Sequence, residues 1–142
     1  HSKKSGLKIN YINASPENLN RNNQFDIILN LEIVEHVDNL SLYISSCNKL
    51  LKNNGIMFTA TLNRTLISYI KAIIGAEYIL RWLPIGTHDW NKFLKPEELE
   101  AYLSKEKFST LDIVGLSFNP FLKKWKKSND LSVNYIISSL KN

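Results

Sequence analysis

The chain has 142 residues and a mass of 16.4 kDa, with 44% hydrophobic and 22% charged residues. This composition excludes a disordered tail and fits one globular domain of ordinary size. The net charge of +5 favours anionic partners, although the basic residues are scattered among acidic ones and most are expected to be solvated. A single cysteine, Cys47, excludes an intramolecular disulfide and a cysteine-based zinc site. No long apolar stretch follows His1, so we expect no signal peptide and a reducing compartment.

The first half of the chain alternates strand and helix patterns. The apolar run 9–12 predicts a short strand, and Ser15 followed by Pro16 predicts the N-cap and first position of a short helix. Residues 25–31 are almost continuously apolar, which predicts a parallel strand that is covered on both faces. We expect Asp38 to cap a helix that runs to about Lys52 and stops at residues 53–55.

The second half continues with a strand over 56–61 and a long apolar helix over 63–83, broken near Gly75. Lys95 and Pro96 begin a further helix that ends near Lys105. The segments 111–116 and 131–137 predict an antiparallel strand hairpin, joined by a basic loop at 123–127.

This order of elements predicts an α/β fold, in which parallel strands are joined by right-handed crossovers and an antiparallel pair lies at the C-terminal edge. The five glycines are isolated from one another, and no GxG sequence is present. Because an open nucleotide-binding sheet normally begins with a strand and a glycine-rich turn, we interpret the sheet as lacking its first half.

An acidic segment with one imidazole follows the strand predicted at 25–31. Glu32, Glu35 and His36 would converge on one point if the segment formed a helical turn. Two carboxylates and an imidazole suit Mg²⁺ or Mn²⁺. The alternative is that one glutamate lies near a helix N-terminus while the other side chains face solvent.

An ordered set of motifs resembles the ubiquinone-biosynthesis O-methyltransferase family, within the class I S-adenosylmethionine-dependent methyltransferases. The motifs span nearly the whole chain; they are residues 25–37, 50–55, 61–64, 75–81, 84–90 and 133–135. The resemblance implies an incomplete Rossmann-like sheet and an enzyme that methylates a phenolic hydroxyl on a polyprenylated catechol-type ring.

The resemblance also implies site residues. The family associates the acidic segment with Mg²⁺, which assigns Glu32, Glu35 and His36 as metal ligands. It assigns Leu31 to the S-adenosylmethionine pocket, and Ala14 and Ser15 to the neighbourhood of the adenine. A metal ion that touches the catechol oxygens would lower their pKa, and the protein would align them with the methyl sulfonium.

The family's glycine-rich loop has no counterpart here, so residues 1–142 are expected to form a partial, C-terminal methyltransferase domain. Such a chain would bind the cofactor poorly, would be inactive alone, and would leave a sheet edge exposed for a separate N-terminal half. A non-catalytic remnant that binds a membrane or a partner is the alternative function.

His88, in the segment 86–90, is the candidate general base, because an unperturbed imidazole titrates near neutral pH. The alternative is a loop histidine that makes an ordinary backbone hydrogen bond.

Residues 63–90 predict an inserted helical cover that contacts an anionic membrane surface. The apolar residues between Arg64 and Arg81 would enter the lipid, while Lys71 and the two arginines would meet headgroups. A buried helix over the active site is the alternative. We therefore expect a cytoplasmic protein, peripheral on the inner face of the membrane. The basic loop 123–127 is interpreted as a solvated tip, and no nucleic-acid partner is expected.

Overall fold

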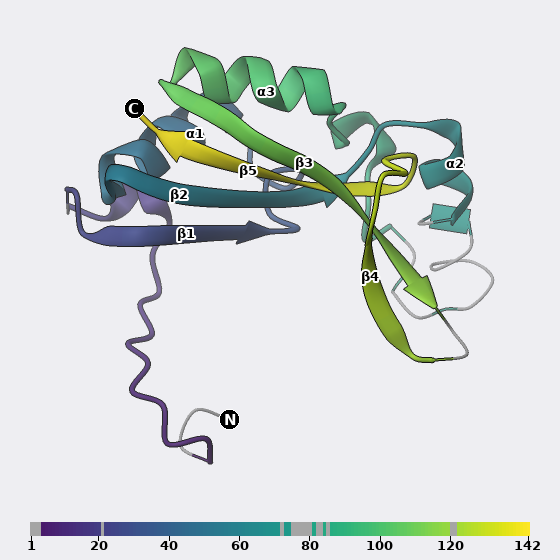
Figure 1. Cartoon of the computed structure of the whole chain (residues 1–142), viewed down its shortest axis with the longest axis horizontal. Coiled ribbons are helices and arrows are strands. Elements are labelled where there is room, and N and C mark those ends of the chain that lie inside the picture. Colours follow the sequence, from purple (N-terminus) through teal and green to yellow (C-terminus); the bar gives the residue numbers. More distant parts are fainter. Residues whose placement is uncertain are drawn as a thin grey trace.

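A computed structural model of the chain describes residues 4–20, 22–71, 73–74, 81, 84, 86–119 and 122–142. The elements follow one another in the order η1 (Pro16–Asn18), β1 (Phe25–Leu31), α1 (Leu40–Leu50), β2 (Leu51–Leu62), α2 (Leu66–Ser68), η3 (Trp90–Lys92), α3 (Pro96–Lys105), β3 (Phe108–Asn119), β4 (Lys124–Ser128) and β5 (Asn134–Lys141). In Figure 1, helices α1 and α3 lie on one side of the strands, and the N-terminal segment extends away from the sheet.

The described strands form one mixed sheet in the order β1-β2-β5-β3-β4. Strands β1 and β2 are parallel and are connected through α1, while β5 is antiparallel to both β2 and β3. The structure therefore confirms the predicted α/β fold with a parallel part and an antiparallel C-terminal part.

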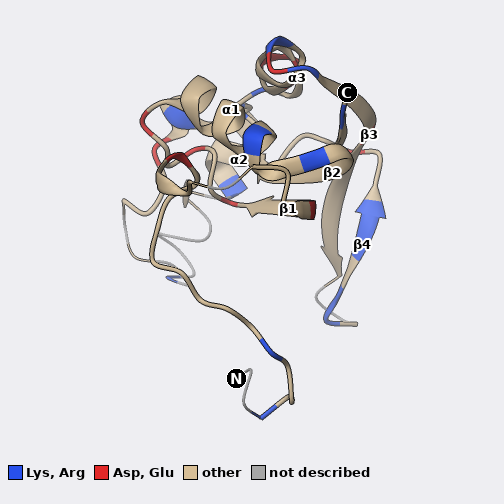
Figure 2. Ribbon diagram, turned by 90° about the vertical axis from the view of Figure 1, so that its left-hand side faces the viewer, with Lys and Arg blue, Asp and Glu red and all other residues tan. Residues whose placement is uncertain are grey.

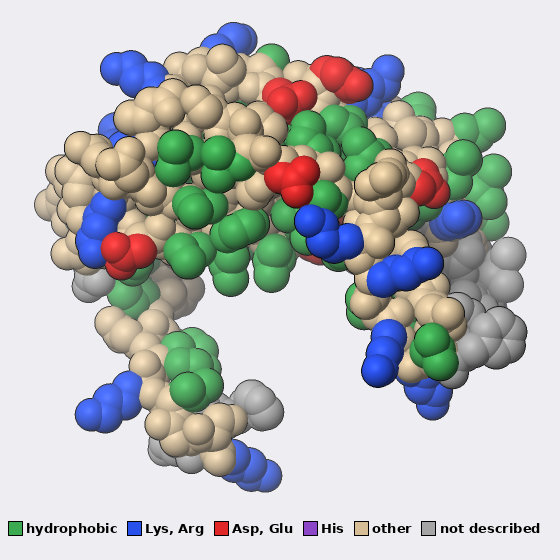
Figure 3. Space-filling model, in the orientation of Figure 1, with side chains coloured by type: hydrophobic (Ala, Val, Ile, Leu, Met, Phe, Trp, Pro, Cys, Tyr) green, Lys and Arg blue, Asp and Glu red, His purple; other side chains and the backbone are tan. Residues whose placement is uncertain are grey.

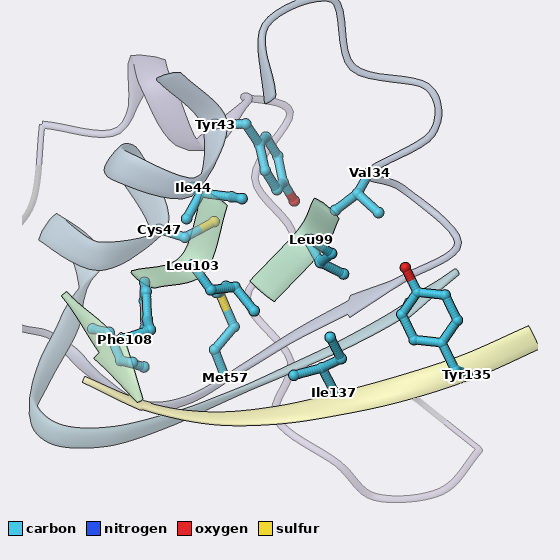
Figure 4. Close-up of a cluster of buried hydrophobic side chains, with 11 residues drawn as sticks. Val34, Tyr43, Ile44, Cys47, Met57, Leu99, Leu103, Phe108, Tyr135 and Ile137 are labelled. Atoms are coloured by element: carbon cyan, nitrogen blue, oxygen red, sulfur yellow. The ribbon is translucent and has the colours of Figure 1, made fainter. Parts of the chain in front are cut away.

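The core lies between the sheet and helices α1 and α3. Its buried side chains come from both helices and from the inward faces of β2 and β5, as Figure 4 shows; they include Tyr43, Ile44, Cys47, Met57, Leu99, Leu103, Tyr135 and Ile137. Asn30 of β1 is one of the polar residues buried in this interior. Its amide accepts a hydrogen bond from the Tyr43 hydroxyl at 2.9 Å and donates to Met57 Sδ at 3.2 Å. These bonds offset the cost of burying the amide.

The opposite face of the sheet is open at β1. Ile27, Leu29 and Leu31 point away from the helices, and each is more than half exposed. Figure 3 shows hydrophobic side chains gathered along this lower edge of the molecule. The prediction that β1 is covered on both faces was wrong, because α1 and α3 cover only the face to which Ile28 and Asn30 belong.

Three local predictions were also wrong. Residues 9–12 form no strand, because the segment 7–15 pairs with no other strand among the described residues. Asn39, and not Asp38, caps α1, since its side chain accepts a hydrogen bond from the Leu42 N–H at 3.0 Å. Residues 53–55 do not end the helix but lie inside β2, which begins directly after Leu50.

The basic segment 123–127, predicted as a loop, mostly forms β4, which pairs with the outer end of β3. In the segment 63–83, α2 covers Leu66–Ser68, and the helical path continues as π-type turns at 69–71 and 73–74. The helix prediction was wrong for residues 63–65, which precede α2, and for Arg81, which is not helical and has a positive φ of 50°. Residues 72, 75–80, 82 and 83 of that prediction, including Gly75, lie outside the described residues. None of the described helices is long and apolar enough to span a membrane.

Candidate functional site

The candidate site lies where β1 and β2 end. Because the two strands are parallel, their carboxyl ends meet at one edge of the sheet, which is the usual place of a ligand crevice in α/β folds. Glu32 directly follows β1, and its N–H continues the ladder by donating to Ala60 O at 3.0 Å. Residues 34–36 then form a turn, closed by the bond from His36 N to Ile33 O at 2.9 Å. The predicted metal-binding segment is therefore a turn rather than part of a helix.

Glu35 is buried, with 3% of its surface exposed. One of its carboxylate oxygens, Oε2, accepts a hydrogen bond from the Thr61 hydroxyl at 2.8 Å. The other, Oε1, is buried and has no hydrogen-bond partner among the described residues. Burying a carboxylate oxygen without a partner is costly, which makes Glu35 Oε1 a candidate ligand for a cation.

Glu32 is coupled to Glu35. Partial burial of the Glu32 carboxyl, together with repulsion from the neighbouring Glu35 carboxylate, raises the pKa of Glu32 to about 7. Its backbone also has a positive φ of 54°, a conformation that non-glycine residues seldom adopt. The turn thus holds two carboxyl groups close together, and the Glu35 carboxylate disfavours the ionised form of Glu32.

Two histidines lie beside one another at this edge. The ring centroids of His36 and His88 are 6.2 Å apart, and His88 also makes an edge contact with the buried Phe93 at 5.9 Å. The structure therefore brings the candidate general base next to one of the predicted metal ligands. Among the described residues, however, no three histidine, cysteine or acidic side chains form a group that could hold a metal ion.

The residues predicted to bind the cofactor are less closely grouped. Leu31 ends β1 with its side chain on the open face. Ala14 and Ser15 lie in the exposed segment before η1, where Ser15 occupies the N-cap position. Its hydroxyl accepts from Asn18 Nδ2 and makes no capping bond with a backbone N–H. No hydrogen bond among the described residues joins Ala14 or Ser15 to the turn 32–36.

Comparisons with known proteins agree with this fold. A family model described as a methyltransferase domain matches residues 1–59. The structure of a possible histamine N-methyltransferase from Thermotoga maritima aligns with 99% of this chain and 67% of its own, with a TM-score of 0.69 and 17% identity. A magnesium protoporphyrin IX methyltransferase from Synechocystis aligns with 91% of this chain and 49% of its own, with a TM-score of 0.57 and 16% identity.

Relatives found by sequence indicate a more specific family than the fold alone does. A ubiquinone biosynthesis O-methyltransferase from Pelagibacter ubique is 56% identical over 142 residues, and one from Bartonella tribocorum is 50% identical over 138 residues. This chain is homologous to the ubiquinone biosynthesis O-methyltransferases. It has the fold of class I S-adenosylmethionine-dependent methyltransferases, as its motifs predicted. These alignments include 100% and 96% of this chain, respectively. The chain spans only 59% and 56% of the relatives' own length.

Thr61 and Asn63 also lie at this edge and had no role predicted from sequence. Thr61 lies near the end of β2 and donates to Glu35 of the acidic turn, and Asn63 directly follows β2. Asn63 Oδ1 is another buried oxygen that has no hydrogen-bond partner among the described residues. Arg64, which was predicted from sequence to meet lipid headgroups, forms an ion pair with Glu98 of α3 and holds the end of β2 against that helix. The signal that could have found Thr61 and Asn63 is their position, since polar residues that follow a parallel strand face the same edge as those after its neighbour.

Proposed function

We propose that this chain forms part of an S-adenosylmethionine-dependent enzyme that methylates a phenolic hydroxyl of a polyprenylated catechol-type ring in ubiquinone biosynthesis. The observation that carries the proposal is the position of the acidic turn 32–36 at the carboxyl edge of the parallel pair β1–β2. The names of the relatives, and their identity of about half over nearly all of this chain, support the same activity.

In this reaction the protein must align the phenolic oxygen with the methyl group and help to form the phenolate. The methyl sulfonium is already a strong electrophile, so the gain comes from holding the phenolic oxygen in line with it and from removing its proton. His88 is suited to accept that proton because it is half-buried at this edge and lies beside His36. Leu31, Ala14 and Ser15 are proposed to contact the cofactor.

Mg²⁺ is the proposed metal cofactor, and Glu32 and Glu35 fit it best. Their carboxylates are neighbours, and Glu35 Oε1 is buried without a partner among the described residues. Proteins commonly give Mg²⁺ only one or two carboxylates and leave its other positions to water and substrate. His36, the third ligand that the resemblance names, does not group with these two carboxylates in the described part of the chain. When bound, the ion supplies Lewis acidity that favours the phenolate.

The activity is best tested in a chimera in which this chain replaces the matching 142 residues of the Pelagibacter ubique protein. We expect transfer of a labelled methyl group to a prenylated catechol, and at least a tenfold loss in the variant Glu35→Gln. The matched control Glu106→Gln, on the far end of α3, should keep the activity. A folded chimera that binds S-adenosylmethionine but transfers no methyl group would contradict the proposal.

A polyprenylated substrate resides in a membrane, so we propose a cytoplasmic protein that is peripheral on the inner face of an anionic membrane. Support comes from the described part of the 63–90 cover, where Leu66, Ile67 and Ile70 are exposed on and after α2. Exposed aliphatic side chains beside basic ones are typical of interfacial helices.

The second candidate function is a non-catalytic module that binds a partner, and the open apolar face of β1 favours it. The partner that fits is a segment equivalent to the part of the relatives that this chain does not span. Calorimetric titration of the chain with S-adenosylmethionine tests whether such a complementing segment is needed. We expect no micromolar binding by the chain alone, and such binding would count against the need for a complementing half.

A further inference from the structure

The β3–β4 hairpin reaches beyond the main sheet. Strand β5 pairs with β3 from Phe108 to Val114, and β4 pairs with β3 from Gly115 to Asn119. The far part of β3 therefore has β4 as its only strand partner among the described residues. Figure 1 shows the two strands projecting away from the α1 and α3 layer.

One face of this hairpin is aromatic and exposed. Phe118 lies opposite Trp125 in the strand register, with ring centroids 5.1 Å apart. The side chain of Trp125 is 62% exposed, and Leu122 in the connecting turn is 68% exposed. Such an exposed apolar tip costs solvation free energy unless another surface covers it.

The same hairpin is strongly basic. Lys123, Lys124, Lys126 and Lys127 surround Trp125, and Figure 2 shows β4 as a run of basic residues. Of these four lysines, only Lys127 forms an ion pair with another described residue, Asp112 at 3.4 Å, and both side chains are largely exposed. The hairpin thus keeps an excess of positive charge directed at solvent.

The hairpin also borders the segment that follows α2. Phe118 and Trp125 line a cavity of about 360 Å³ together with Lys71 and Val133. Lys71 continues the π-type turns after α2, close in sequence to the exposed Ile67 and Ile70. Apolar and basic side chains from two separate elements therefore meet around one cavity.

We propose that the β3–β4 hairpin is a second membrane-contact element, in which Trp125 and Leu122 enter the headgroup region while the lysines bind anionic lipid. Tryptophan is favoured at the membrane interface, and each lysine near an anionic surface strengthens binding. A nucleic acid could stack on Trp125, but the exposed Leu66 and Ile67 of the neighbouring α2 are aliphatic and suit a lipid surface better. This inference rests on the proposed association with a membrane and names a surface outside the predicted 63–90 cover.

The test is flotation of the 142-residue chain with phosphatidylcholine vesicles that contain roughly one-third phosphatidylglycerol. We expect wild type to float, and Lys124→Gln/Lys126→Gln to lower the partition coefficient by about tenfold. Adding Trp125→Ala to these two substitutions should lower the partition coefficient further. The matched control Lys8→Gln/Lys49→Gln removes the same charge from elements away from the hairpin and should bind as wild type. Equal melting temperatures of all variants exclude unfolding as the cause.

Two further arms separate the explanations. If Ile67→Glu/Ile70→Glu abolishes flotation while the hairpin variants float as wild type, the hairpin inference is overturned and the membrane proposal stands. If wild type does not float, both fail. Loss of binding to a single-stranded RNA by the hairpin variants, with unchanged flotation, would overturn the lipid assignment in favour of nucleic acid. The methyl-transfer assay of the chimera is independent of all these outcomes.

Discussion

Glu32 combines a left-handed backbone with a carboxyl whose pKa is raised to about 7. The folded chain therefore holds this proton more tightly than the unfolded chain, in which the group ionises near its ordinary value of 4.5. The stability that the protonated group contributes is present at low pH and is lost as the pH rises from about 4.5 to about 7.

We accordingly expect Glu32→Gln to stabilise the metal-free protein at about pH 8 and to change it little at about pH 5. Because the residue is partly solvated, the gain is about 1 kcal/mol rather than the full value of the shift. Urea unfolding in EDTA at both pH values measures it, with Glu17→Gln on η1 as the control. An equal effect at the two pH values would contradict the origin of the raised pKa.

Lys141, near the C-terminus, fastens β5 to α1. Its ammonium is buried and donates to Asn48 O at 2.7 Å, to Leu51 O at 2.8 Å and to Asn23 Oδ1 at 3.1 Å. Lys141→Met keeps the apolar stem but leaves these acceptors unpaired at the end of a helix, so we expect a loss of about 3 kcal/mol. Chemical unfolding checks this, and Lys124→Met, on an exposed strand, should change the stability by less than about 0.5 kcal/mol.

The sequence predicted which kinds of residue form the candidate site, but not the contacts between them. The acidic turn could be found because it follows a strongly apolar strand, and its position at the carboxyl edge follows from the parallel pairing. The bond from Thr61 to Glu35 could not be found, because it joins residues that are 26 positions apart and depends on the register of β1 against β2.

Among the elements, β3 depends on Gly115 at the point where its pairing changes from β5 to β4. A Cβ atom there would lie 1.9 Å from the carbonyl oxygen of Asp130, which belongs to the connection between β4 and β5. Gly115→Ala forces backbone apart, and we expect a loss of more than about 2 kcal/mol. Thermal unfolding measures this, with Ser117→Ala as the control. A melting temperature within the error of wild type would show that the connection moves freely.

Elements with a strong local signal were predicted well, and those that depend on pairing were not. Helix α3 begins at Pro96 and ends at Lys105, as its proline and final basic residue indicate. The apolar segment 9–12 has the composition of a strand but no neighbour with which to pair. Conversely, β4 has the composition of a solvated loop and becomes a strand because Trp125 lies opposite Phe118 on a long neighbour.

The molecule as a whole has an apolar sheet face and a free strand edge at β1. Ile27 and Leu29 project from the face that α1 and α3 leave uncovered, and β1 has β2 as its only strand partner among the described residues. Uncovered edges and apolar faces of this kind drive association.

We therefore expect the chain alone to associate as its concentration rises and to bind a dye that reports apolar surface. Ile27→Thr/Leu29→Thr should lower the dye emission several-fold and shift the sedimentation profile toward the monomer, because threonine keeps the strand propensity while removing apolar area. Leu42→Thr, an exposed leucine on α1, is the matched control and should change neither measurement. A monomeric wild type with low dye emission at all concentrations would show that this face is already covered, and the need for a complementing segment would then have no physical basis.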